Sequence, residues 1–132
     1  MHHDRTLLDF EDACDWLTGY LLRKPETKAA ILVPLLRQAD RYVDQLVNLS
    51  VGTHIRSSDG QRILYPNGSI VRLYSMAQSG QLRGALFHVG LVQDWISAGA
   101  SPGQFDTRRR ALENLEMTVR LGDRPRLRFV HA

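Results

Sequence analysis

The sequence predicts an α/β domain in which helices flank a mixed, mostly parallel β-sheet. Short apolar runs of strand length are followed by segments whose apolar residues recur at helical spacing. Turn signals separate several short strands in the middle of the chain. The chain has 132 residues, of which 43% are hydrophobic and 23% are charged. We therefore expect one domain, residues 1–132, with a core of its own.

The first part of the chain predicts two helices separated by a strand. Apolar residues recur at helical spacing from Leu7 to Arg23, and Pro25 ends the pattern. Lys28 to Val33 is a short apolar strand, and Pro34 suits the first position of a second amphipathic helix. A strand followed directly by such a helix is half of an α/β unit.

The middle of the chain predicts an antiparallel flap and then a central strand. Ser58-Asp59-Gly60 and Asn67-Gly68 are turn signals between three short strands, the last of which covers Ser69 to Ser75. Such strands suit the edge of an otherwise parallel sheet. Leu86 to Gln93 is a longer apolar run, which predicts a buried strand at the centre.

The last third predicts a long helix, Phe105 to Leu121, and a final strand, Arg126 to Val130, at an edge or half-exposed position. Its arginines could bind phosphates or an acidic partner: Arg108, Arg109, Arg110, Arg120, Arg124, Arg126 and Arg128. The acids that crowd the first helix are a candidate docking face for a partner: Asp9, Glu11, Asp12 and Asp15. Both groups also fit ordinary solvated helix faces that complement the helix dipole.

Four short motifs follow one another in a characteristic order. They are Tyr65-Pro66-Asn67-Gly68, Gln81-Leu82-Arg83-Gly84, the strand from Leu86 to Asp94, and Val119 to Arg126. In this order they resemble the ATPase domain of phage terminase large subunits, the motors that package DNA into capsids. The resemblance implies a domain like a P-loop ATPase. It places Arg83 and Gly84 in the loop before the Walker B strand.

The chemistry of that family is incomplete in this sequence. The phosphate-loop pattern GxxxxGK(S/T) is absent, and Met1 to Thr6, ahead of the first helix, contain neither glycine nor lysine. We therefore expect a partial domain that lacks the first strand and the phosphate loop. The resemblance places Gln93 at the position of the magnesium-binding acid and Asp94 at the position of the glutamate that orients water. We interpret this pair as a relic Walker B motif and predict no catalytic residue, cofactor or metal site.

These observations favour a non-hydrolysing, terminase-like binding protein of phage or mobile-element origin. It would act through protein–protein contacts, as a packaging factor, a decoy or an inhibitor of a host defence system. A missing strand would leave its neighbours unpaired, so we also expect self-association or a tightly bound protein partner. Three alternatives stay open: an ATPase subunit completed in trans by a chain that carries the phosphate loop, a basic nucleic-acid-binding module, and a remnant of a decayed prophage gene.

Cysteine content and hydropathy narrow the cellular setting. The single cysteine, Cys14, cannot form an internal disulfide. No apolar run approaches the roughly 18 residues of a membrane-spanning helix, and no leader opens the sequence. We therefore expect a cytoplasmic protein without a membrane partner.

Overall fold

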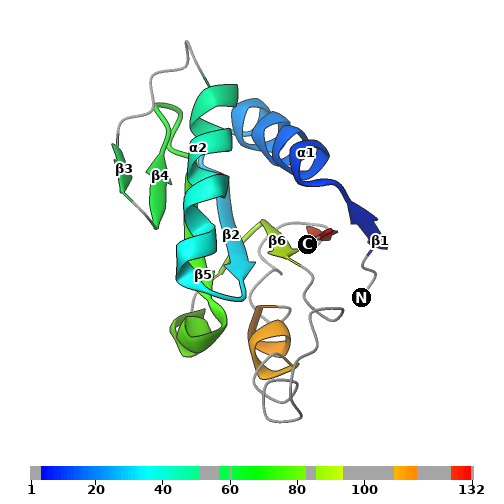
Figure 1. Ribbon diagram of the computed structural model, residues 1–132. Helices are drawn as coiled ribbons and strands as arrows, with labels where there is room; N and C mark the ends of the chain where they lie inside the picture. Colours follow the sequence, from blue (N-terminus) through cyan, green and yellow to red (C-terminus); the bar gives the residue numbers. More distant parts are fainter. Residues whose placement is uncertain are drawn as a thin grey trace.

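The structure is a computed structural model that describes residues 4–50, 57–59, 61–82, 86–93, 109–115 and 126–131. The described residues form one seven-stranded sheet with helical segments on both faces (Figure 1). In chain order the strands are β1 (Asp4–Leu8), β2 (Lys28–Val33), β3 (Ser57–Asp59), β4 (Arg62–Leu64), β5 (Ile70–Ser75), β6 (Val89–Gln93) and β7 (Arg126–Val130). The helices are α1 (Phe10–Arg23), α2 (Ala39–Leu49) and residues 109–115, and the 3₁₀ segments are η1 (Leu36–Gln38) and η2 (Met76–Leu82).

The sheet has the order β1-β7-β6-β2-β5-β4-β3. The first five strands in this order pair in parallel, whereas β4 pairs antiparallel with β5, and β3 antiparallel with β4. The predicted mixed, mostly parallel sheet with flanking helices is therefore confirmed, and an antiparallel flap lies at its edge. The predicted turn is shifted, however, because Ser58 and Asp59 belong to β3 and pair with Ile63 and Arg62 of β4. β6 lies next to the middle strand β2, and it begins at Val89 rather than at Leu86, which is 52% exposed.

The core lies in two layers because alternate residues of each strand point to opposite faces. Ala29, Ile31 and Val33 of β2 pack beneath α1 and α2. Ala30 and Leu32 pack on the other face, against η2 and the helix at 109–115. Figure 1 shows α1 and α2 together on one side of the sheet and the helix at 109–115 on the other.

The N-terminal segment differs from the prediction. Asp4–Leu8 form a strand, and α1 begins at Phe10 rather than at Leu7. The apolar pair Leu7-Leu8 fits the spacing of either element, and pairing of Leu8 with Val130 of β7 fixes the extended form. We predicted that no strand precedes the first helix. This prediction is wrong, because β1 precedes α1 and lies at the end of the strand order.

The final strand also lies elsewhere than predicted. β7 is an interior strand between β1 and β6, not an edge strand. Leu127 and Phe129 face the core layer of the helix at 109–115, while Val130 faces the layer under α1. The alternation of apolar and basic residues in β7 has another cause. Arg128 lies on the α1 side of the sheet, where its guanidinium carbon is 5.4 Å from the centre of the Trp16 ring.

The second helix begins later than Pro34. Residues 36–38 form η1, and α2 follows from Ala39. The side-chain oxygen of Gln38 accepts a hydrogen bond from the Leu35 amide at 2.9 Å, which holds this turn in its tighter form. The apolar face is as predicted, with Val43 and Leu46 in the core.

The turn at Pro66-Asn67-Gly68 closes the C-terminal end of α1. The Asn67 side-chain amide donates to the carbonyl of Leu21 at 2.9 Å, and the Ser69 hydroxyl lies 3.0 Å from the same oxygen. Gly68 has φ +87°, a conformation that favours glycine. This motif therefore satisfies carbonyls that the helix itself leaves without partners.

His88 joins the amino ends of β2 and β6. Its backbone N–H donates to the carbonyl of Lys28 at 2.8 Å, and its Nδ1 accepts from the Lys28 amide at 3.0 Å. Burial, followed by the charges of Lys28 and Lys24, lowers the pKa of this imidazole, which favours the neutral form that can accept the bond.

Candidate functional site

The carboxyl ends of the parallel strands are the first place to look for a site in this fold. In open α/β sheets, ligands bind where two adjacent strands send their connections to opposite faces. Here β2 leads into α2 on one face, and its neighbour β6 is followed by the helix at 109–115 on the other. The switch therefore lies between β2 and β6, beside Gln93.

Gln93 is held by a tyrosine from α2. The hydroxyl of Tyr42 donates to Oε1 of Gln93 at 3.0 Å, and the two residues are 0% and 4% exposed. Burial raises the pKa of the Tyr42 hydroxyl, an effect to which Cys14 adds and which Arg41 opposes. The phenol therefore keeps its proton and remains a donor to the neutral amide.

Aromatic rings fill the space between this pair and the start of α1. The ring of Phe10 meets that of Tyr42 edge to face, with centroids 4.9 Å apart. The guanidinium carbon of Arg41 lies 3.9 Å from the centre of the Phe10 ring. Burial raises the pKa of the nearby Cys14 thiol to about 12, so this side chain packs as a small apolar group.

The junction between β1 and α1 consists of one residue, Asp9. Its backbone is extended and its side chain, which is exposed, makes no capping hydrogen bond to the helix. A phosphate loop needs about eight residues between strand and helix so that backbone N–H groups can surround the phosphates. The β1–α1 junction has no room for such a loop.

The structure places some predicted site residues and not others. Gln93 ends β6, as predicted, and all four acids of the proposed docking face are exposed at the start of α1. Arg109 and Arg110 are exposed on the helix at 109–115, on the opposite side of the sheet from Arg128, while Arg126 begins β7. The remaining predicted residues lie outside the described part of the chain: Arg83, Gly84, Asp94, Arg108, Arg120 and Arg124.

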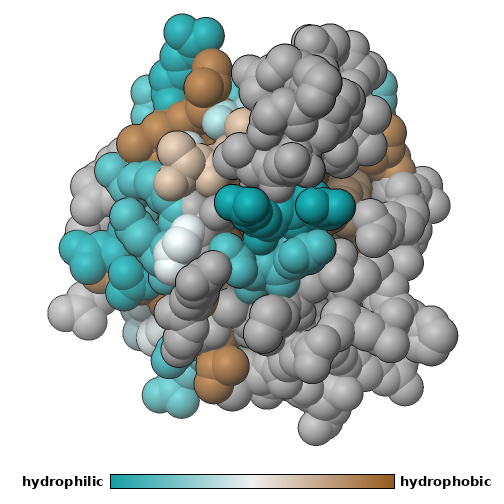
Figure 2. Space-filling view, turned by 90° about the horizontal axis from the view of Figure 1, so that it is seen from below, coloured by the Kyte–Doolittle hydropathy of each residue, from teal (hydrophilic) through white to brown (hydrophobic). Residues whose placement is uncertain are grey.

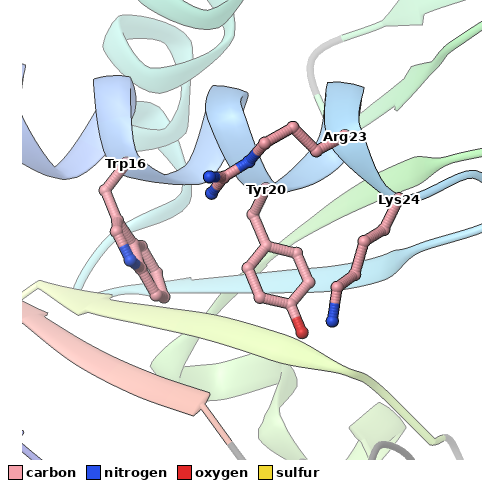
Figure 3. A pocket seen from close by; sticks show the side chains of 4 residues that line it. All are labelled: Trp16, Tyr20, Arg23 and Lys24. Atoms are coloured by element: carbon pink, nitrogen blue, oxygen red, sulfur yellow. The ribbon is translucent and has the colours of Figure 1, made fainter.

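Two groups of residues near these elements gave no recognisable site signal in the sequence. Phe10, Arg41 and Tyr42 were missed because an aromatic residue at helical spacing gives the same signal whether it fills a core or covers a site. The second group lines a pocket of about 370 Å³ beside α1: Trp16, Tyr20, Arg23 and Lys24 (Figure 3). Spacing along α1 places these side chains near one another, but only the structure shows that they surround a hollow.

The described residues offer neither a metal site nor a membrane span. Within these ranges, no three His, Cys, Asp or Glu side chains lie close enough together to hold a metal ion. None of the helices in the same ranges has the length and apolar character needed to cross a membrane.

Figure 2 views the molecule from below as drawn in Figure 1, the side toward which the arrow of β2 points, and hydrophilic side chains dominate the described part of this side. Brown apolar residues appear there only in small separate groups. Scattered apolar groups of this kind are ordinary on a protein surface.

Solved structures share this arrangement over nearly the whole chain. The large-terminase ATPase domain of Thermus phage P74-26 superimposes with a TM-score of 0.65 at 18% identity, covering 91% of this chain. The fold is that of a terminase ATPase domain. The terminase-like fold also matches the bacteriophage Phi-29 viral genome packaging motor assembly, with a TM-score of 0.62, 12% identity and 92% of this chain covered. A large terminase from a thermophilic bacteriophage gives a TM-score of 0.57 at 8% identity over 91% of this chain.

The terminase-like chain is shorter than these proteins. It spans 53% of the P74-26 chain, 38% of the Phi-29 chain and 29% of the large terminase from the thermophilic bacteriophage. No family model matches the sequence, and no curated protein matches it either. The resemblance predicted from the four motifs is therefore confirmed at the level of the fold.

Proposed function

We propose that this chain is a terminase-like domain that does not hydrolyse ATP and acts by binding another protein. The observation that carries the proposal is the β1–α1 junction, where Asp9 alone stands between strand and helix. Hydrolysis in P-loop ATPases depends on positioning and charge stabilisation of the phosphates by that loop and its lysine. Without the loop, the β1–α1 junction supplies neither the positioning of the phosphates nor the stabilisation of their charge.

The Walker B position supports the same proposal. An amide oxygen is a weaker ligand for magnesium than a carboxylate, and the oxygen of Gln93 already accepts the Tyr42 hydroxyl at 3.0 Å. Phe10 packs against Tyr42 from the start of α1, beside the junction at which a P-loop enzyme holds phosphate.

The exposed acids of α1 favour a protein partner. Its exposed acids stand together at the start of α1, on an element anchored at its other end by the turn at Asn67. The solved structures that share the fold include a viral genome packaging motor assembly. We therefore propose a partner in packaging machinery, with this chain as an accessory subunit or competitor. A host defence protein is the other outcome of the capture experiment below.

The nucleotide part of the proposal is tested by thermal unfolding with and without Mg²⁺ and millimolar ATP. We expect no change in Tm and no release of phosphate. A ligand present at about one hundred times its Kd adds about 2.7 kcal/mol to stability, so a site of ordinary affinity would be seen. A terminase ATPase domain with an intact phosphate loop serves as the positive control. A rise in Tm with ATP, or phosphate release by this chain alone, would contradict the proposal.

The docking face is tested by charge reversal on α1. A tagged copy is recovered from phage-infected cells at moderate salt, and the co-purifying proteins are identified by mass spectrometry. Glu11→Lys with Asp15→Lys is expected to reduce capture of the partner at least fivefold relative to the unmodified chain. The matched control is Asp40→Lys with Asp44→Lys, which reverses two acids at the same spacing on α2. Equal capture by both variants would remove the acids of α1 from the interface.

A further inference from the structure

The flank of α1 that faces away from α2 carries a stripe whose charge changes sign along the helix. Residues three or four positions apart share a side of a helix, so Asp9, Asp12, Trp16, Tyr20 and Arg23 lie in one row. The two acids and Arg23 are exposed, and the two aromatic residues are half-buried. The row is therefore acidic at its start, aromatic in the middle and basic at its end.

The basic and aromatic half of this stripe borders the pocket beside α1. Figure 3 shows Trp16, Tyr20 and Lys24 projecting from α1 toward the strands, with Arg23 running back along the helix. Nζ of Lys24 lies 5.1 Å from the centre of the Tyr20 ring, and Nε of Arg23 donates to the carbonyl of Gly19 at 3.0 Å. Two cations are thus held beside a partly exposed aromatic surface, an arrangement that suits carboxylates carried by another helix.

The stripe is self-complementary about its midpoint. Asp9 precedes Trp16 by seven positions and Arg23 follows it by seven, which is about 10 Å along the axis in each direction. A two-fold axis at Trp16 would therefore bring Asp9 of each copy to Arg23 of the other. Surfaces of this kind form isologous dimers, in which each contact occurs twice.

The edge of the sheet lies on the same side of the molecule. Figure 1 shows β1 beside the start of α1, at the end of the strand order. Among the described strands β1 has a neighbour on one side only, and a strand edge of this kind can pair with another strand across a two-fold axis.

We propose that a second copy of this chain docks on the α1 flank, antiparallel to the first, with Trp16 at the centre. The acidic half of each stripe then meets the basic half of the other at an axis separation of about 8–10 Å, the usual range for packed helices. The resulting association is weakened by salt because the paired charges stand near the surface.

Gly19 provides a substitution that separates folding from association. A Cβ at this position would meet only the Nη2 of Arg23, at 3.8 Å, which is ordinary contact. Residues other than glycine and proline also favour a helix interior more than glycine does. Gly19→Gln should therefore fold normally, yet its side chain would lie between the two helices and weaken the dimer.

The experiment is sedimentation velocity on the full chain over a hundredfold range of concentration at low salt. Two charge variants are compared: Asp9→Arg with Asp12→Arg, and Arg23→Glu with Lys24→Glu. Each pair of substitutions leaves the stripe with charges of one sign, so each is expected to raise the dimer Kd at least tenfold. Gly19→Gln is expected to raise it by a similar factor. Mixed in equal amounts, the two charge variants are expected to form a one-to-one dimer, because opposite charges face each other again.

The mixing result decides the proposal. The acids and bases of α1 also complement the helix dipole, but that role does not predict recovery on mixing. The inference is overturned by an unmodified chain that stays monomeric, by charge variants that still dimerise alone, or by a mixture that does not associate. The stripe shares Asp9 and Asp12 with the proposed docking face, but a monomer would leave the nucleotide experiment and the Glu11 and Asp15 capture experiment unaffected.

Discussion

Tyr42→Ala is expected to lower the free energy of unfolding by about 3–5 kcal/mol, the range found when a large buried aromatic side chain is removed. Tyr42 is 0% exposed, packs edge to face on Phe10 and donates to Gln93. The substitution leaves a cavity and a buried amide oxygen without its donor. Chemical denaturation monitored by circular dichroism measures the loss.

Tyr42→Phe is the matched control, because it keeps the ring and removes only the hydroxyl. A buried acceptor that loses its donor costs about 1–3 kcal/mol, so this variant should fall between the unmodified chain and Tyr42→Ala. If both variants unfold at the same denaturant concentration as the unmodified chain, Tyr42 does not hold the carboxyl edge together. Neither variant is expected to bind ATP, since opening a cavity supplies no phosphate loop.

Ile31→Ala is expected to cost about 2–5 kcal/mol at the centre of the sheet. Ile31 is fully buried in β2, and its register neighbours are Leu73 of β5 and Leu91 of β6. The lost side chain therefore leaves a cavity beneath α1 and α2 that rigid strands on both sides cannot close. The same denaturation experiment measures the effect.

Leu35→Ala is the control for this substitution. Leu35 is 48% exposed, and surface changes away from special features usually stay within about 0.5 kcal/mol. Similar losses for the two variants would contradict the two-layer core described for β2, because that core predicts a large difference between them.

The fold could be predicted from the sequence where local patterns and tertiary pairing agree. The apolar stripe of α1, with Cys14 and Leu17 at its centre, is stable only when it packs against an apolar surface. In the structure it packs on one face of the sheet. The run ending at Gln93 is mainly apolar, which predicts a buried strand inside the sheet, and β6 is such a strand. The flap was predictable because Asn67-Gly68 permits few other conformations.

The errors share a cause, which is pairing between distant parts of the chain. Leu7 and Leu8 fit a helix or a strand, and only β7, at the other end of the sequence, decides between them. The same pairing makes β7 interior, although its alternation with Arg128 resembles an edge strand. The contact between Tyr42 and Gln93 joins residues 51 positions apart, and no local spacing predicts it.

The one-residue junction at Asp9 also has a mechanical consequence. Hinges in proteins are loop residues whose φ and ψ angles absorb a change in orientation, and here a single pair of angles separates β1 from α1. With β1 paired to β7 and the far end of α1 bonded to the turn at Asn67, neither element can swing without the other. We therefore expect β1 and α1 to move as one rigid unit.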